Sequence, residues 1–175
     1  ERLAHHLHAL ANGCDDRPVE PARKVQSVGR ETTFPKDLRT AEEAKEALLK
    51  LAGEVGWRLR RAGLRAHTVH LKVRLGDFST FTRQRTFDVP LCYDEDLYDA
   101  ACVLFDELKR PPGGIRLLGL SGSGFGAVGA MSLFDDSRKK ERLYAAIDTL
   151  RQRYGETILT RAPLVKPAQN DETRG

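Results

Sequence analysis

The sequence predicts an α+β domain in which a four-stranded antiparallel sheet carries two helices on one face, followed by a C-terminal tail with one further helix. Three observations predict this fold. Residues 68–75 alternate polar and apolar side chains strictly, as in a strand with one buried face. Thr40 and Glu43 form a capping box in front of a long amphipathic helix. The elements follow the order strand, helix, strand, strand, helix, strand, which is typical of a βαββαβ sheet domain.

Composition and charge limit the possible classes. The chain has 175 residues, 40% of them hydrophobic, which suits one domain with extensions and a real core. A net charge of +4 and a pI near 9.1 permit a polyanionic partner. Because no apolar run reaches the roughly 18 residues of a membrane span, and no signal peptide opens the sequence, we expect no membrane partner. Three cysteines without a CxxC pair favour a reducing cytoplasm.

The first 23 residues are predicted to lie outside the sheet domain. Residues 1–13 carry leucines at helical spacing and end at Gly13, which predicts the end of a helix whose apolar face lacks a partner and indicates a fragment. Its three histidines are joined by no cysteine or carboxylate cluster, so we interpret them as a solvated surface rather than a metal site. Residues 14–23 are polar with two prolines, which predicts a linker.

The first strand is predicted over residues 24–34 and is expected to end at Pro35. Gly29 inside it indicates a bulge or the close approach of another backbone. The helix that follows Thr40 runs to about Ala62, and Trp57 within it is interpreted as a packing residue. Its C-terminal end is rich in arginine, at positions Arg58, Arg60, Arg61 and Arg65. Cations are favoured there by the helix dipole, and we adopt this interpretation.

Residues 66–87 are predicted to form a β-hairpin. After the alternating strand, Gly76 and Asp77 supply the turn, and residues 79–87 return as a strand that Pro90 closes. Four basic residues stand on the hairpin, with Asp77 as the one nearby acid: Lys72, Arg74, Arg83 and Arg85. Basic and hydroxyl side chains on an open sheet suit phosphate oxygens, although a merely solvated face has the same composition.

One detail of the hairpin requires an explanation. Arg83 and Arg85 alternate in phase with Phe81 and Phe87, so both pairs cannot simply face solvent. The pattern therefore predicts a bulge or an edge position for this strand.

The remaining elements complete the sheet and the tail. Asp94, Glu95 and Asp96 open the second helix, where the helix dipole explains their presence better than a metal site does. A largely buried last strand is predicted over residues 115–120, and a Ser/Gly stretch follows it. Residues 138–154 are predicted to form an amphipathic helix with one apolar stripe, consisting of Leu143, Ile147, Leu150 and Tyr154.

Three separated segments carry a resemblance to a known family. KVQSVGRETTF, HTVHLKVRLGDFSTFTRQRTF and IRLLGLSGSGF, in this order, resemble the little-finger domain of bacterial Y-family translesion polymerases of the DNA polymerase IV type. LANGCDDRPVEP is similar to the junction of thumb and linker, and MSLFDD followed by ERLYAAIDTLRQRYG to the C-terminal tail. The resemblance implies the following organisation: the end of a thumb helix over 1–13, a linker over 14–23, the little finger over 24–124, a linker with a clamp-binding motif over 125–137, a C-terminal helix and extension over 138–164, and a disordered tail over 165–175.

The resemblance also implies a function and a set of contacts. In that family the little finger lays its sheet in the major groove of primer-template DNA, without regard to sequence, and holds both backbones through main-chain amides and short polar or basic side chains. The positions that match the family's contacts are Ser27, Gly29, Arg30, Thr82, Arg83, Arg116 and Ser121. The pattern of charge adds Lys72, Arg74 and Arg85.

A second contact is implied in the tail. Met131, Ser132, Leu133 and Phe134 resemble the sliding-clamp-binding motif, in which a glutamine is followed by apolar residues ending in Leu-Phe. Ala130 stands where the glutamine is expected, so we expect weak binding. The alternative is that the Leu-Phe pair packs against the terminal helix.

Catalysis is not expected from this chain. The family transfers nucleotides in a palm domain whose carboxylates hold two metal ions, Mg²⁺ in the full-length polymerase, and no matching motif occurs here. We therefore expect no cofactor in this chain, and palm, fingers and thumb as partners. Two other hypotheses remain: an RNA-binding module of the same βαββαβ topology, which needs aromatic side chains on the central strands, and a small ferredoxin-like enzyme, for which no nucleophile–base pair is present.

Overall fold

The computed structural model describes residues 2–15, 17–18, 24–108, 113–125, 136–155 and 158–164. Its elements are α1 (Arg2–Ala11), β1 (Ser27–Leu38), α2 (Ala41–Arg61), β2 (Ala66–Leu75), β3 (Thr80–Leu91), α3 (Asp94–Asp106), β4 (Ile115–Phe125), α4 (Asp136–Tyr154) and the 3₁₀ turn η1 (Ala162–Leu164). The predicted βαββαβ order is confirmed, with one helix before it and one after it.

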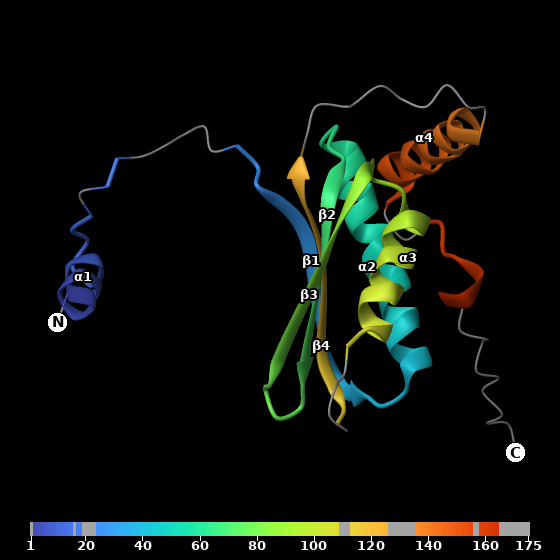
Figure 1. Ribbon diagram of the computed structural model, residues 1–175. Helices are drawn as coiled ribbons and strands as arrows, with labels where there is room; N and C mark the ends of the chain where they lie inside the picture. Colours follow the sequence, from blue (N-terminus) through green and yellow to red (C-terminus); the bar gives the residue numbers. More distant parts are fainter. Residues whose placement is uncertain are drawn as a thin grey trace, which may run out of the picture.

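The four strands form one antiparallel sheet in the order β1-β4-β2-β3. Helices α2 and α3 lie side by side against one face of this sheet, and α4 lies beyond them on the same side, whereas α1 lies apart (Figure 1). The predicted two-layer architecture is confirmed. The predicted clamp motif, most of the linker 14–23 and the tail 165–175 lie outside the described residues.

Three strand ends differ from the prediction. β1 continues through Pro35 to Leu38, because the pairing with β4 lapses between Thr33 and Leu38 and the missing proline N–H removes no ladder bond. β3 continues through Pro90 at the sheet edge for a similar reason. β4 runs through the Ser/Gly stretch to Phe125, since pairing on both sides outweighs the low strand propensity of serine and glycine.

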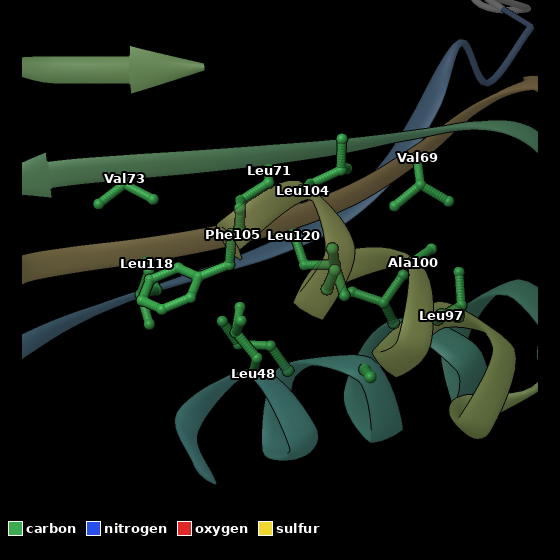
Figure 2. Close-up of a cluster of buried hydrophobic side chains, with 14 of the residues drawn as sticks. Leu48, Val69, Leu71, Val73, Leu97, Ala100, Leu104, Phe105, Leu118 and Leu120 are labelled. Atoms are coloured by element: carbon green, nitrogen blue, oxygen red, sulfur yellow. The ribbon is translucent and has the colours of Figure 1, made fainter. Parts of the chain in front are cut away.

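The core fills the space between the sheet and the two helices. Figure 2 shows Leu48 of α2 and Phe105 of α3 pointing towards Leu71 and Leu118 of the sheet, all of them essentially inaccessible to water. Trp57 is 8% exposed and belongs to the buried set, which confirms its interpretation as a packing residue. Each fully buried side chain of this size stabilises the fold by about 1.5–3 kcal/mol.

The start of α2 is built as predicted. Thr40 Oγ1 accepts a hydrogen bond from the Glu43 amide at 3.1 Å, and Glu43 Oε2 accepts from the Thr40 amide at 3.1 Å. Backbone hydrogen bonds from Arg39 and Thr40 lower the pKa of Glu43. The capping box is therefore complete, and it fixes where the helix begins.

Helix α4 docks through a different face from the one predicted. Leu143, Leu150 and Tyr154 are 53%, 40% and 57% exposed, whereas Tyr144, which the predicted stripe omits, is 1% exposed. The ring of Tyr144 stacks on Tyr93 with 4.9 Å between centroids. The apolar stripe was the wrong criterion, because this helix is held by a stack of aromatic rings and by ion pairs.

The ion pairs centre on Arg60 of α2. Its guanidinium donates to both carboxylate oxygens of Asp148 at 2.7 and 2.8 Å and to Asp94 Oδ1 at 2.8 Å, and it lies 4.4 Å from the centroid of the Tyr144 ring. Burial alone would lower the pKa of Arg60, but the hydrogen bond to Asp148 and the charge of Asp94 outweigh it and raise the pKa. The dipole interpretation of Arg60 was thus incomplete: this arginine joins α2, α3 and α4.

Candidate nucleic-acid interface

The sheet face opposite the helices is the candidate interface. The helices α2, α3 and α4 all lie on the other side of the sheet (Figure 1). Strand register assigns sixteen positions to this open face, in four rows across β1, β4, β2 and β3: Ser27–Ser123–Thr68–Thr86, Gly29–Ser121–His70–Gln84, Glu31–Gly119–Lys72–Thr82 and Thr33–Leu117–Arg74–Thr80. These rows hold mostly hydroxyl, amide and basic side chains, with one acid, Glu31, and one buried apolar side chain, Leu117.

The middle of the open face is a broad hollow of about 900 Å³. Its floor is low because the central rows carry Gly29, Gly119 and Ser121. A Cβ added to Gly29 would lie 2.5 Å from the Cβ of Ser121, so the two strands approach closely there. The predicted close approach at Gly29 is confirmed, and only glycine fits this position without displacing β4.

Six of the ten predicted contact residues lie on the open face: Ser27, Gly29, Lys72, Arg74, Thr82 and Ser121. The Lys72 ammonium is held by Glu31, with Nζ at 2.9 and 3.0 Å from the two carboxylate oxygens. Arg74 Nε donates to Thr80 Oγ1 at 2.9 Å. The basic groups of the face are therefore oriented by side chains on other strands of the sheet.

Three predicted residues project from the helix side of the sheet instead. Arg30 is opposite Leu120 in the register and pairs with Glu54 of α2 at 3.0 Å. Arg85 pairs with Glu107 at the end of α3. Arg83 is opposite Leu71, yet its side chain is exposed and borders the hollow at the rim of the sheet.

The structure also accounts for the arginines of β3, which alternate in phase with its phenylalanines. The register between β2 and β3 runs without interruption from Arg74–Thr80 to Thr68–Thr86, so no bulge separates Phe81 from the two arginines, and it shifts between Thr86 and Leu91, where Phe87 lies. β3 is an edge strand, and its helix-side arginines reach solvent past the edge. Both parts of the prediction are therefore found: β3 lies at the edge, and its register with β2 shifts beyond Thr86.

Arg116 occupies a bulge at the far end of the face. The register steps from Arg74–Leu117 to Leu75–Ile115, which leaves Arg116 as the extra residue of β4. Its guanidinium lies 5.2 Å from the centroid of the Phe78 ring at the β2–β3 turn. Phe78 has a φ of 67° and is 64% exposed, so this ring is accessible at the turn.

Sequence reasoning missed two residues at the centre of the face. His70 and Gln84 are neighbours in the row that crosses the hollow, and His70 Nε2 lies 2.7 Å from Ser123 Oγ. The signal was present, because His70 alternates in phase with Lys72 and Arg74. It was overlooked because histidine carries no full charge at neutral pH.

The three acids at the start of α3 do not fit a metal centre. Asp94 is 2% exposed and surrounded by Arg60, Arg151 and Arg161 at 2.8, 3.8 and 3.6 Å. Its neighbours Glu95 and Asp96 both face Lys140 of α4. In the part of the chain that the structure describes, no three histidine, cysteine or acidic residues come together as metal ligands.

None of the described helices combines the length and the hydropathy that crossing a membrane requires.

Comparison with known proteins identifies the family. Residues 25–133 match the model of the impB/mucB/samB family C-terminal domain. The chain belongs to this family. The resemblance to the little finger of Y-family DNA polymerase IV is thereby confirmed.

Individual relatives agree with this assignment. The chain is 31% identical to DNA polymerase IV of Clostridium kluyveri over 183 residues, covering 97% of this chain and 46% of the relative. It is 42% identical to DNA polymerase IV of Akkermansia muciniphila over 115 residues, covering 66% and 32%. A solved Y-family DNA polymerase chimera of Dbh and Dpo4 shares the fold with a TM-score of 0.53 and 21% identity, covering 71% of this chain and 36% of that one. The chain thus spans less than half the length of these relatives.

Proposed function

We propose that this little-finger domain binds duplex primer-template DNA through its open face, as the DNA-holding part of an error-prone translesion polymerase. The composition of that face carries the proposal. Four rows of short hydroxyl, amide and basic side chains form a broad uncovered surface with a single acid, Glu31. Such side chains bind phosphate and sugar oxygens, which position a protein on DNA without reading its sequence.

The basic groups define the expected strength of binding. Lys72 and Arg74 stand on the face, Arg83 borders it, and Arg116 stands at its far end. If each of the four contacts one phosphate, the logarithm of the association constant falls with the logarithm of salt concentration with a slope of about −4, since each contact contributes about 0.9. Binding is therefore expected to be weak at physiological salt and indifferent to sequence.

An RNA-binding role is less well supported by the geometry. Single-stranded RNA is held by aromatic side chains on which bases stack. Phe81 and Phe87 project to the helix side of the sheet, where both pack against the core, and the sixteen open-face positions include no phenylalanine, tyrosine or tryptophan. Duplex DNA therefore fits this face better.

Nucleotide transfer is assigned to the rest of the polymerase. The relatives that match this chain are DNA polymerases more than twice its length, and the acids of α3 are held by cations in a way that does not fit catalytic Mg²⁺. The chain alone, supplied with Mg²⁺, nucleotides and a primer-template, is expected to give no primer extension.

A sliding clamp is the second proposed partner. The motif Met131–Phe134 lies between the end of β4 at Phe125 and the start of α4 at Asp136. Without the glutamine at position 130, we expect a dissociation constant for the tail above about 1 μM, which corresponds to less than about 8 kcal/mol of binding free energy. The double change Leu133→Ala and Phe134→Ala is expected to abolish clamp binding in surface plasmon resonance and to leave the melting temperature unchanged. A loss of many degrees would instead assign the pair to the core.

The decisive experiment measures binding of the chain to labelled nucleic acids by fluorescence anisotropy. Two duplexes of unrelated sequence and a single-stranded RNA of equal length are compared between about 50 and 200 mM salt. We expect equal affinity for both duplexes, weaker binding to RNA and a steep salt dependence. A preference for the RNA, or a slope near zero, would overturn the proposal.

A further inference from the structure

We infer that His70 is a proton-dependent phosphate contact at the centre of the open face, so that DNA binding strengthens as the pH falls. This inference rests on the proposed function and concerns the regulation of the same surface. It starts from the position of His70 in the row Gly29–Ser121–His70–Gln84, in the middle of the hollow.

The neighbours of His70 leave its ring accessible from the DNA side. β4 contributes Ser121 and Ser123 next to it, and β1 contributes Gly29 beyond Ser121. These side chains are short or absent, and His70 is half-buried. A phosphate that enters the hollow would meet this ring and the serine hydroxyls together.

A hydrogen bond to one nitrogen orients the His70 ring and leaves the other nitrogen available to a ligand. Nε2 lies 2.7 Å from Ser123 Oγ, which orients the imidazole. Nδ1 hydrogen-bonds to none of the residues that the structure describes. When the ring is protonated both nitrogens are donors, so Nε2–H donates to the serine oxygen and Nδ1–H remains for an anion.

The charged groups around the hollow carry a net positive charge before DNA binds. Lys72 follows on β2, Glu31 faces Lys72 from β1, and Arg30 of β1 and Arg83 of β3 also border the hollow. β4, the strand that supplies the hydrogen-bond partner, offers serines and no titratable group beside the ring. A phosphate bound in the hollow adds negative charge near the ring, and a nearby negative charge favours the protonated imidazole.

Proton uptake on binding follows by linkage. Histidine ordinarily titrates between pH 5 and 8, whereas the phosphodiesters of DNA stay charged throughout that range. If DNA binds the protonated ring ten times more tightly than the neutral one, the affinity at pH 5.5 exceeds that at pH 8.0 by up to about tenfold. The added phosphate contact also steepens the salt dependence by about 0.9 at the lower pH.

The experiment uses the full chain, a labelled duplex and fluorescence anisotropy between pH 5.5 and 8.0. The wild type is compared with His70→Gln, which retains an amide that can bond Ser123, and with the control His67→Gln. His67 is also on β2, but its Nδ1 is already hydrogen-bonded to the Phe87 carbonyl oxygen, 3.0 Å away. We expect the tenfold rise in affinity and the steeper salt slope in the wild type and in His67→Gln, and their loss in His70→Gln.

The outcomes separate this inference from the function on which it rests. If all three proteins bind duplex DNA at pH 8.0 with the same pH dependence, His70 is not the proton-dependent contact, and the DNA-binding function still stands. If the wild type binds no duplex at any pH, the proposed function fails as well. Melting temperatures of the variants verify that they remain folded, and a titration of the His70 ring by NMR with and without DNA must show protonation at higher pH in the complex.

Discussion

Replacing Arg60 with methionine tests whether α4 is an integral part of the domain. Methionine retains most of the apolar stem and removes the guanidinium, whose side chain is only 10% exposed. The change leaves the carboxylates of Asp94 and Asp148 without their main partner. Breaking a buried ion pair in this way costs about 3–5 kcal/mol, because an uncompensated charge stays in the protein interior.

The structure places the cost at the lower end of that range. Arg151 and Arg161 remain within 3.8 and 3.6 Å of Asp94 and compensate part of its charge. The loss is therefore about 3 kcal/mol, which corresponds to a fall in melting temperature of about 6–12 °C for a chain of this size.

Thermal unfolding followed by circular dichroism measures the effect. Arg61→Met is the matched control, because Arg61 follows Arg60 on the same helix and its side chain is exposed. We expect the control to melt within about 2 °C of the wild type, since surface substitutions usually change stability by less than about 0.5 kcal/mol. Equal melting temperatures for the two variants would refute the role of Arg60 in holding α4 against α2 and α3.

Two further predictions concern glycines of α2 and the acid of the open face. Gly56→Ala is expected to destabilise the domain by about 1–3 kcal/mol in urea unfolding, because the new Cβ would overlap Asp94 Oδ1. Gly53→Ala, whose Cβ would lie 3.6 Å from Asp94, is expected to stabilise the domain by about 1 kcal/mol. A more stable Gly56→Ala than Gly53→Ala would contradict the packing described. Glu31→Gln removes an acid from the face and releases Lys72. We therefore expect tighter duplex binding in fluorescence anisotropy and a salt dependence of the association constant that is steeper by about 0.9. Weaker binding would show that the Glu31–Lys72 pair organises the site.

Local patterns predicted the sheet, its two helices and their order. Strict alternation over residues 68–75 identified Val69, Leu71, Val73 and Leu75 as the β2 side chains that enter the core, and the capping box located the start of α2. These signals lie within one element, so no tertiary knowledge is needed to use them. Pro35, by contrast, sits inside β1, because whether a proline ends a strand depends on the partner strand and the edge, which the local sequence does not contain.

The candidate site was predictable only in part, and for the same reason. Period-two alternation gives the phase of a side chain within its own strand, but not whether the strand is central or at the edge. Arg83 and Arg85 therefore looked like open-face residues, although β3 is an edge strand whose helix-side arginines reach solvent past the rim. The glycine spacing of α2 gave no sign of the buried carboxylate that Gly56 accommodates.

The two layers of the domain are joined at β1 by arginines whose roles can be seen only in the fold. Arg58 of α2 donates to the Gly29 carbonyl at 2.9 Å, and Arg30 of β1 pairs with Glu54 of α2 at 3.0 Å. Gly29 lies on the open face, so the strand that borders the hollow is held from behind by the same helix that anchors α4 through Arg60. Residues on α2 thus add to the pairing with β4 in setting the position of this edge strand. A shallow surface that binds phosphates through short side chains depends on such fixed strand positions, because side chains of one or two heavy atoms cannot follow a displaced backbone.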